Sequence, residues 1–505
     1  MDFRQVSRVG LLAVGVVALF GAAADAQTLR IGLQDDPDAL DPALSRTFTG
    51  RIVFASMCDK LVDIAPDLSF VPQLALSWET APDGKALTLK LRPDVKFQDG
   101  ETFDAAAVKY NIERSLTLPG TQRKSEIGSV ASVDVVDPLT VRLNLSAPSA
   151  PLLAQLSDRA GMMVSPKAAQ AAGTNFATHP VCAGPYKFVD RVPQDHITVE
   201  RFADYWDKAR ITIPRITYQP IPDTTVRLAN LQSGQLDLIE RLHPTDLDAV
   251  KQDKRFVIST QTGLGYNGIT FNIASTEAVN PAFKDPRVRR AFSLAIDREA
   301  INQVVYNGVY EVGNQPVPPD SPFYDKALPA PARDVAKAKA LLKEAGQPTP
   351  MLTMTVTNNN ESLQIAQIMQ AMVAEAGITL KIVATEFTTM LDQGNRGNFE
   401  SEMTAWSGRV DPDGNLYSFL SCKGALNDGK YCDPALDKLL DEARVTGDRA
   451  KRIELYHQVF ELADKDSPIV YFNHQKWINV FTAKLEGYKA YPDGMIRVYD
   501  LKLKS

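Results

Sequence analysis

The feature that most constrains the fold of this chain is a repeated alternation of strand-like and helix-like segments. Residues 29–33 and 87–91 have the apolar spacing of β-strands, and residues 133–145 predict a hairpin around an Asp-Pro turn. A helix predicted over residues 224–233 stops at a glycine, and a strand over residues 236–239 follows it. This alternation predicts an α/β fold.

Amphipathic helices dominate the second half of the sequence. Apolar residues three and four positions apart, with a capping residue at one or both ends of most of them, identify these helices. The predicted helices begin at Pro286, Asp297 and Asp334, a fourth carries Ile365 to Val373 and ends at Gly377, and a fifth carries Ile453 to Ala463. Their apolar stripes are typical of helices that face a core, so none of them is interpreted as a cofactor site.

Length and charge narrow the class of protein. The chain has 505 residues, which predicts roughly three domains. It carries 55 Lys and Arg against 61 Asp and Glu, a net charge of −6, and this balance argues against a nucleic-acid partner. One apolar run lies at the N-terminus and no other could span a membrane, so a protein embedded in the membrane by several helices is excluded.

The N-terminal run predicts a secretory signal peptide over residues 1–26. Arg4 and Arg8 precede an apolar segment over residues 10–20, and Ala24-Asp25-Ala26 is a small-x-small cleavage site. An uncleaved membrane anchor is the alternative, but the run is shorter than the roughly 20 residues that a spanning helix needs. We expect an exported protein that is cleaved near Ala26.

The chain contains four cysteines, an even number that suggests disulfides in an exported protein. Cys422 and Cys432 bracket a short polar loop and predict a local disulfide, which leaves Cys58 to pair with Cys182. A zinc site is the weaker alternative, because no Cys-x-x-Cys spacing occurs and histidines are few.

Motifs of catalysis are missing from the sequence. It has no G-x-S-x-G, P-loop, dinucleotide-binding or H-E-x-x-H pattern, and its five histidines are scattered. We therefore expect no catalytic residue, no bound metal and no cofactor. Three polar and aromatic stretches, residues 44–50, 266–272 and 404–415, are candidates for binding, with ordinary loops as the alternative.

Seven blocks of sequence, taken in order, resemble the bacterial family 5 extracellular solute-binding proteins. These are the subunits of ABC importers that bind dipeptides, oligopeptides, nickel or opines. The blocks are SWETAPDGKALTLKLRPDVKF at 77–97, QDGETFDAAAVKYNIERS at 98–115, CAGPYKFVDR at 182–191, LANLQSGQLDLIE at 228–240, YNGITFNIAS at 266–275, DPRVRRAFSLAIDREAI at 285–301 and WSGRVDPDGN at 406–415.

The resemblance implies a type II periplasmic-binding-protein-like fold, with two hinged lobes and an inserted α/β domain. Lobe I would comprise residues 27–59, 185–268 and 482–505, the inserted domain residues 60–184, and lobe II residues 269–481. The hinge is expected near Asn272 and near His474 to Asn479. The Cys58–Cys182 bridge would tie the two ends of the inserted domain together.

The resemblance also implies binding without chemistry. A monomeric periplasmic protein would capture a short peptide or an amino-acid conjugate between its lobes and deliver it to an inner-membrane permease driven by cytoplasmic ATPases. A metal chelate or another carboxylate-rich molecule is the alternative ligand, and a periplasmic hydrolase is the least favoured function.

One departure from the family pattern bears on the ligand. Peptide-binding relatives carry an Asp three residues after the tryptophan equivalent to Trp406, where it pairs with the peptide ammonium, and this chain has Arg409. We therefore expect an anionic ligand group near Arg409, with Trp406 packing on the ligand. Alternatively, Arg409 pairs with Asp411 or Asp413 within its own loop, or Asp411 takes over the ammonium. The remaining candidate ligand contacts are Arg46, Phe48, Thr49, Tyr266, Asn272, Asn358 and Ser407.

Overall fold

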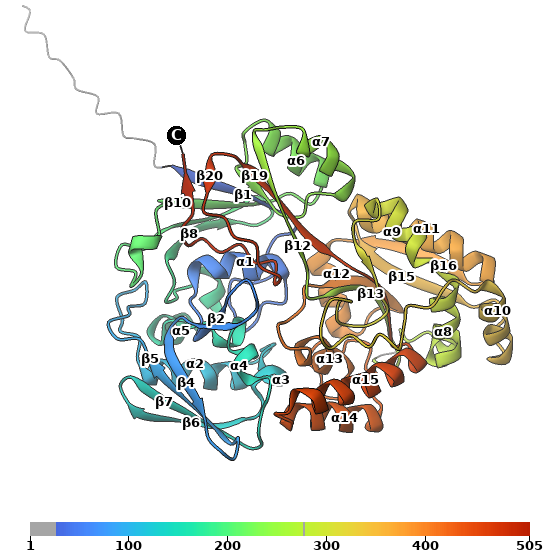
Figure 1. The fold of residues 1–505 in the computed structure, drawn as a ribbon, viewed down its shortest axis with the longest axis horizontal. Helices are drawn as coiled ribbons and strands as arrows, with labels where there is room; N and C mark the ends of the chain where they lie inside the picture. Colours follow the sequence, from blue (N-terminus) through green and yellow to red (C-terminus); the bar gives the residue numbers. More distant parts are fainter. Residues whose placement is uncertain (1–26, 276–277, 505) are drawn as a thin grey trace, which may run out of the picture.

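The computed structural model describes residues 27–275 and 278–504, and three main sheets organise them (Figure 1). The first sheet has seven strands and the second has six, and a four-stranded sheet belongs to a smaller domain. We call the part built on the seven-stranded sheet the first lobe, the part built on the six-stranded sheet the second lobe, and the part built on the four-stranded sheet the small domain.

The seven-stranded sheet has β1 near its centre, parallel to β10 on one side and to β11 on the other. Leu29, Ile31 and Leu33 of β1 are fully buried, as expected for a strand covered on both faces. In spatial order the strands are β12 (Phe256–Thr262), β19 (Lys476–Thr482), β11 (Leu238–Ile239), β1 (Thr28–Leu33), β10 (Arg215–Pro220), β9 (His196–Arg201) and β8 (Tyr186–Val192). The lobe also contains α1 (Phe48–Met57), α6 (Thr224–Gln232), α7 (Leu247–Lys251), β20 (Leu485–Glu486) and β21 (Lys502–Leu503).

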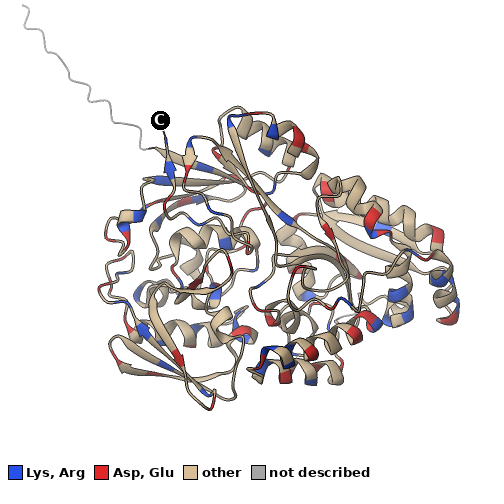
Figure 2. Ribbon diagram, in the orientation of Figure 1, with Lys and Arg blue, Asp and Glu red and all other residues tan. Residues whose placement is uncertain are grey.

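The six-stranded sheet mixes parallel and antiparallel pairs, and β15 is parallel to both β16 and β17. Its strands in spatial order are β14 (Glu311–Val312), β18 (Ile469–His474), β13 (Tyr266–Phe271), β17 (Ser401–Trp406), β15 (Met351–Thr357) and β16 (Thr379–Thr385). Its helices are α8 (Pro286–Ala295), α9 (Arg298–Tyr306), α10 (Val335–Glu344), α11 (Asn360–Ala376), α12 (Phe387–Arg396), α13 (Asp413–Leu420), α14 (Pro434–Val445) and α15 (Arg449–Asp466). Figure 2 shows charges of both signs along α14 and α15, which is the pattern of helices with one solvated face.

The small domain is an antiparallel sheet in the order β4 (Ala75–Thr80), β5 (Ala86–Leu91), β7 (Thr140–Leu145) and β6 (Val130–Asp137), with α2 (Ala105–Thr117) packed on β6 and β7. The predicted hairpin is confirmed as β6 and β7. Its remaining elements are β2 (Val62–Ile64), β3 (Phe70–Pro72), α3 (Lys124–Ile127), α4 (Leu152–Gln155) and α5 (Pro166–Ala172).

Two segments cross from one lobe to the other, from β12 to β13 and from β18 to β19 (Figure 1). They meet at His474, whose Nδ1 lies 2.7 Å from the carbonyl oxygen of Gly265. Three expectations about this region are corrected. Residues 476–481 belong to the sheet of the first lobe and not to lobe II, because β19 pairs with β11 and β12. Residues 266–268 belong to β13 in the sheet of the second lobe and not to lobe I. Asn272 lies at the far end of β13, where its amide donates to the carbonyl oxygens of Gly397 and Phe399 at 3.0 and 2.8 Å, away from the crossing.

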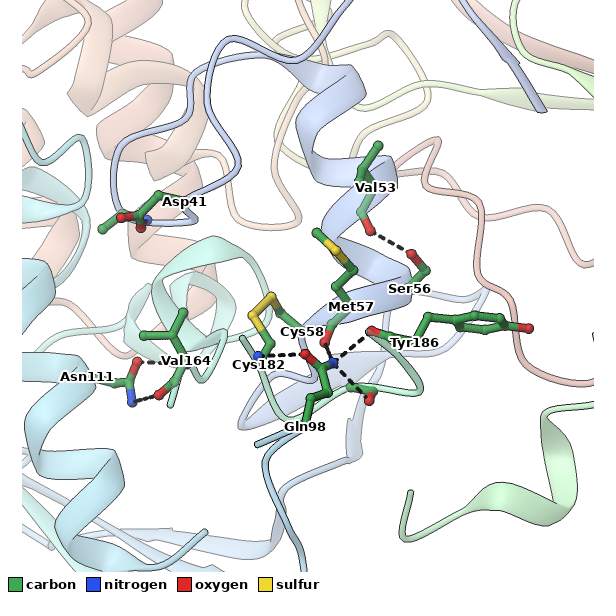
Figure 3. The surroundings of a disulfide bond; sticks show 12 residues. Asp41, Val53, Ser56, Met57, Cys58, Gln98, Asn111, Val164, Cys182 and Tyr186 are labelled. Atoms are coloured by element: carbon green, nitrogen blue, oxygen red, sulfur yellow. Dashed lines mark hydrogen bonds between the residues drawn. A yellow bond between two sulfur atoms is a disulfide. The ribbon is translucent and has the colours of Figure 1, made fainter. Parts of the chain in front are cut away.

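Both predicted disulfides are present, Cys58–Cys182 and Cys422–Cys432. The first joins the end of α1 to the segment that leads into β8, so it closes the small domain onto the first lobe (Figure 3). Gln98 reinforces this junction, since its amide donates to the carbonyl oxygens of Met57 and Tyr186 at 2.7 Å and its carbonyl accepts from the backbone N–H of Cys182 at 2.8 Å. All polar atoms of this side chain are therefore satisfied at the domain junction.

Candidate ligand-binding site

A cavity lies between the two lobes. Its volume is about 150 Å³, which leaves room for several water molecules. The first lobe contributes residues that follow the carboxyl ends of β1 and β11, and the second contributes β13, β17 and residues that follow β15 and β16. Ligands of open α/β sheets bind at this edge.

The wall from the first lobe is aromatic and cationic. Phe48 at the start of α1 stacks on Trp477 of β19, with ring centroids 4.4 Å apart. The guanidinium of Arg241 lies 4.9 Å from the Phe48 ring centroid and 5.0 Å from that of Trp477. This arrangement holds a charged group and a flat apolar surface side by side.

The wall from the second lobe is a set of buried and partly buried aromatic rings. Trp406 packs edge to face on Phe419 at 4.8 Å, and its indole N–H donates to Asn415 at 2.9 Å. Tyr266 packs in the same way on Tyr471 at 4.6 Å. With its N–H satisfied inside the protein, Trp406 can offer a ligand only its ring.

An ion pair spans the cavity between the lobes. Arg46, which precedes α1, contacts Asp428 of the second lobe at 2.8 Å and also hydrogen bonds to Asn395 of α12. Both ion-pair partners are largely buried, with side chains 10% and 13% exposed. The lobes are therefore closed on each other in this structure.

Buried arginines lie at the small-domain end of the cavity. Arg51 of α1 contacts Asp158 at 2.5 Å and donates to Ser407 at 3.0 Å, and Arg409 contacts the same Asp158 at 3.3 Å. Burial acts to raise the pKa of Asp158, but the adjacent Arg409 and Arg51 outweigh it and hold this pKa well below the usual range. Asp158 thus joins the small domain to both lobes.

Two acids facing the cavity have raised pKa values. Burial raises the pKa of Asp35, which follows β1, to about 7, with Arg241 opposing the shift. Burial and the neighbouring Asp428 raise the pKa of Glu402 on β17 to about 8. A cationic ligand group beside either acid would favour its charged form.

Five of the ten residues expected to contact ligand line the cavity, and five do not. Arg46, Phe48, Tyr266, Trp406 and Ser407 are in the lining. The others lie outside the lining: Thr49 is buried inside α1, Asn272 donates to backbone carbonyl oxygens, Asn358 is exposed, Arg409 contacts Asp158, and Asp411 pairs with Arg452 at 2.7 Å.

The alternative pairing of Arg409 with Asp411 or Asp413 is not formed. Asp411 is taken by Arg452 and Asp413 by Arg444, each at 2.7 Å. Arg409 instead lies over the Trp406 ring, 4.2 Å from its centroid, and is only 6% exposed. Arg409 therefore packs behind Trp406, which lines the cavity, and does not line the cavity itself.

Several residues that line the cavity are not among the ligand contacts predicted from the sequence. Gln34 and Asp35 follow β1, Arg241 comes two residues after β11, and Asn359 comes two residues after β15. For Gln34, Asp35 and Arg241, the position after strands predicted from the sequence was an available signal. No local pattern marks Arg123, Arg159 or Asp428, which long-range folding brings to the cavity.

Among residues 27–275 and 278–504, no group of three or more His, Cys, Asp and Glu side chains could hold a metal ion. Within the same residues, no helix has the length and apolar character to cross a membrane.

A hinged pair of α/β lobes that encloses a polar and aromatic cavity defines a solute-binding protein. Residues 69–427 match the family model of bacterial extracellular solute-binding proteins, family 5 Middle. The chain belongs to this family.

The proteins to which the chain is similar include a glutathione-binding protein and structures solved with a peptide or with agropinic acid. It is 28% identical to the glutathione-binding protein GsiB of Pectobacterium atrosepticum, over 100% of both chains. The structure of the periplasmic binding protein DppA from Helicobacter pylori in complex with peptide STSA is 26% identical, with a TM-score of 0.87 over 95% of this chain and 98% of that one. The structure of AgaA from A. tumefaciens R10 in complex with agropinic acid is 27% identical, with a TM-score of 0.87 over 95% and 99%.

Proposed function

We propose that this chain captures a short peptide or an amino-acid conjugate in the periplasm and delivers it to an ABC permease. The observation that carries the proposal is the inter-lobe cavity, whose lining combines buried arginines, acids and aromatic rings. A free peptide or conjugate has a carboxylate, an ammonium and an apolar body, and each finds a matching group there.

Glutathione is a specific candidate, because GsiB relatives are similar over the full length of the chain. A carboxylate-rich small molecule, including a metal chelate held through its chelator, is a second candidate, favoured by the arginines of the lining. We further propose that the exported chain is cleaved near Ala26, acts as a monomer and has no enzymatic activity.

Thermal unfolding of the purified protein tests these proposals, after partial unfolding and refolding to remove any carried-over ligand. The panel contains reduced glutathione, Ala-Ala, Ala-Ala-Ala, an opine and nickel–histidine. A true ligand at 100 times its dissociation constant adds about 2.7 kcal/mol to the free energy of unfolding. Stabilisation by none of these compounds would contradict the proposed ligand class. Turnover of a bound peptide would instead support a periplasmic hydrolase.

A further inference from the structure

Four buried arginines meet where the first lobe, the small domain and the second lobe join. Arg51 comes from α1, Arg123 and Arg159 from the small domain, and Arg409 from the segment after β17. Arg51, Arg123 and Arg159 are 1–2% exposed and Arg409 is 6% exposed, so water screens their charges poorly. Guanidinium groups stay protonated in proteins, so the cluster carries four positive charges.

Among the residues that the structure describes, only two carboxylates form ion pairs with these four arginines. Glu126 contacts Arg123 at 2.6 Å, and Asp158 serves Arg51 and Arg409. Other acids nearby have other partners: Asp41 pairs with Arg114 at 2.5 Å and Asp413 with Arg444, and Asp38 accepts hydrogen bonds from the hydroxyl groups of Ser45 and Thr47 at 2.7 and 2.9 Å. The cluster therefore retains two more positive than negative charges.

Arg159 is the arginine of the cluster without a close carboxylate partner, and Arg123, which pairs with Glu126, lies beside it. Both guanidinium groups donate to one neutral acceptor, the carbonyl oxygen of Ser45, at 3.2 and 2.7 Å. Asp158 is 3.7 Å from the Nε of Arg159, too far for a hydrogen bond. Burial and the neighbouring charges of Arg123 and Arg409 lower the pKa of Arg159 well below its usual range.

Both arginines also line the ligand cavity. The Nε–H groups of Arg123 and Arg159 are buried and have no hydrogen-bond partner within residues 27–275 and 278–504. A buried donor without a partner is rare and costly, most of all on a charged group.

We propose that Arg123 and Arg159 form a carboxylate subsite, and that a ligand carboxylate bound there supplies the negative charge that the closed protein lacks. The proposal rests on the proposed function and narrows its ligand to molecules with a free carboxylate at this end. Because Arg409 belongs to the second lobe and the other three arginines do not, closure adds a positive charge to the cluster. A carboxylate therefore favours the closed form over the open one.

Arg159→Gln is the variant that tests the subsite, because Asp158 keeps Arg51 and Arg409 as partners when Arg159 is neutral. Arg123→Gln is less suitable, since the charge of Arg123 is already compensated by Glu126. Arg114→Gln is the matched control, an arginine of the small domain that pairs with Asp41 outside the cavity lining.

Calorimetric titration compares each acid probe with its carboxamide, using reduced glutathione with its diamide and Ala-Ala with Ala-Ala-amide. In the unaltered protein and in Arg114→Gln, we expect an acid to bind about 10- to 150-fold more tightly than its amide. Arg159→Gln should lose most of this preference, and Arg159→Lys should keep part of it. An unchanged preference in Arg159→Gln, or inorganic phosphate that competes with the acids, would overturn the carboxylate subsite.

A measurement without ligand separates this inference from the proposed function. If Arg159 carries uncompensated charge, Arg159→Gln should unfold at a higher temperature than the unaltered ligand-free protein, whereas Arg114→Gln should not. A lower unfolding temperature for Arg159→Gln would overturn the inference. A raised temperature in a protein that binds none of the probes would support the uncompensated charge and reject the proposed ligands.

Discussion

Arg46 is the side chain through which the first lobe reaches across the cavity, and its bonds to Asp428 and Asn395 exist only when the lobes are closed. We predict that Arg46→Ala weakens ligand affinity by about tenfold or more, because charge-assisted hydrogen bonds that favour the closed form are lost. Calorimetry with a ligand from the panel measures the change. Arg210→Ala removes an exposed ion pair with Asp500 of the first lobe and should leave the affinity unaltered. Equal losses in both variants would contradict the role given to Arg46.

Glu402 gives the site a dependence on pH. Its folded pKa of about 8 lies above the ordinary value of a glutamate, so between roughly pH 4.5 and 8 the folded state holds a proton that the unfolded state has released. Stability contributed by this group therefore falls as the pH rises through that window. We predict that Glu402→Gln gains on the order of 2 kcal/mol relative to the unaltered protein between pH 5 and pH 8, as measured by urea unfolding. A difference that stays constant with pH would contradict the shift.

Individual contacts were predictable from the sequence only where neighbours in the chain determine them. The sequence predicts Phe48 and Trp406 as ligand contacts, because an aromatic side chain in a polar stretch needs a surface on which to pack. Both residues line the cavity. The ion-pair partner of Arg409 could not be predicted from neighbouring residues, since Asp158 lies in a different domain. The sequence offered Asp411 and Asp413 as nearer acids, and both turn to arginines of α14 and α15.

At the scale of elements, the loop between α13 and α14 connects a disulfide to the ion pair across the cavity. Cys422 and Cys432 close this loop, and Asp428 lies inside it. We predict that Cys422→Ser with Cys432→Ser weakens ligand affinity several-fold, because Asp428 must then be ordered when the lobes close. In an Asp428→Asn background the same cysteine changes should have a smaller effect, which a double-mutant cycle measures. Additive losses would show that the disulfide acts elsewhere.

Helices and strands were predicted well where their signals are local. Asp297 and Asp334 cap α9 and α10 as expected, and Gly377 ends α11 with a φ of 100°. The strand predicted over residues 236–239 is shorter, because the N–H of Leu236 bonds to Asn230 at the end of α6. The need for a glycine at position 408 could not be predicted from the sequence. The φ of Gly408 is 84° and a Cβ there would lie 2.3 Å from the backbone of Leu264, a contact between distant segments.

At the scale of the whole molecule, Asp158 is the one described carboxylate that contacts arginines of both lobes from the small domain. We predict that Asp158→Asn lowers the free energy of unfolding by about 3–5 kcal/mol, because it leaves buried guanidinium groups unpaired. Urea unfolding measures the loss. Glu113→Gln, which removes an exposed pair with Lys109 on α2, should cost less than about 0.5 kcal/mol. Comparable losses in the two variants would contradict the role of Asp158 in joining the small domain to both lobes.

The order of strands in the first lobe has a consequence for how the chain reaches its folded state. β1 begins the described chain, its neighbours β10 and β11 come near the middle, and β19, which pairs with β11 and β12, comes near the C-terminus. The central sheet therefore cannot be completed until residues 476–482 are available for pairing. Such non-local pairing is slow to form, so the first lobe stays incomplete for as long as its last strand is missing.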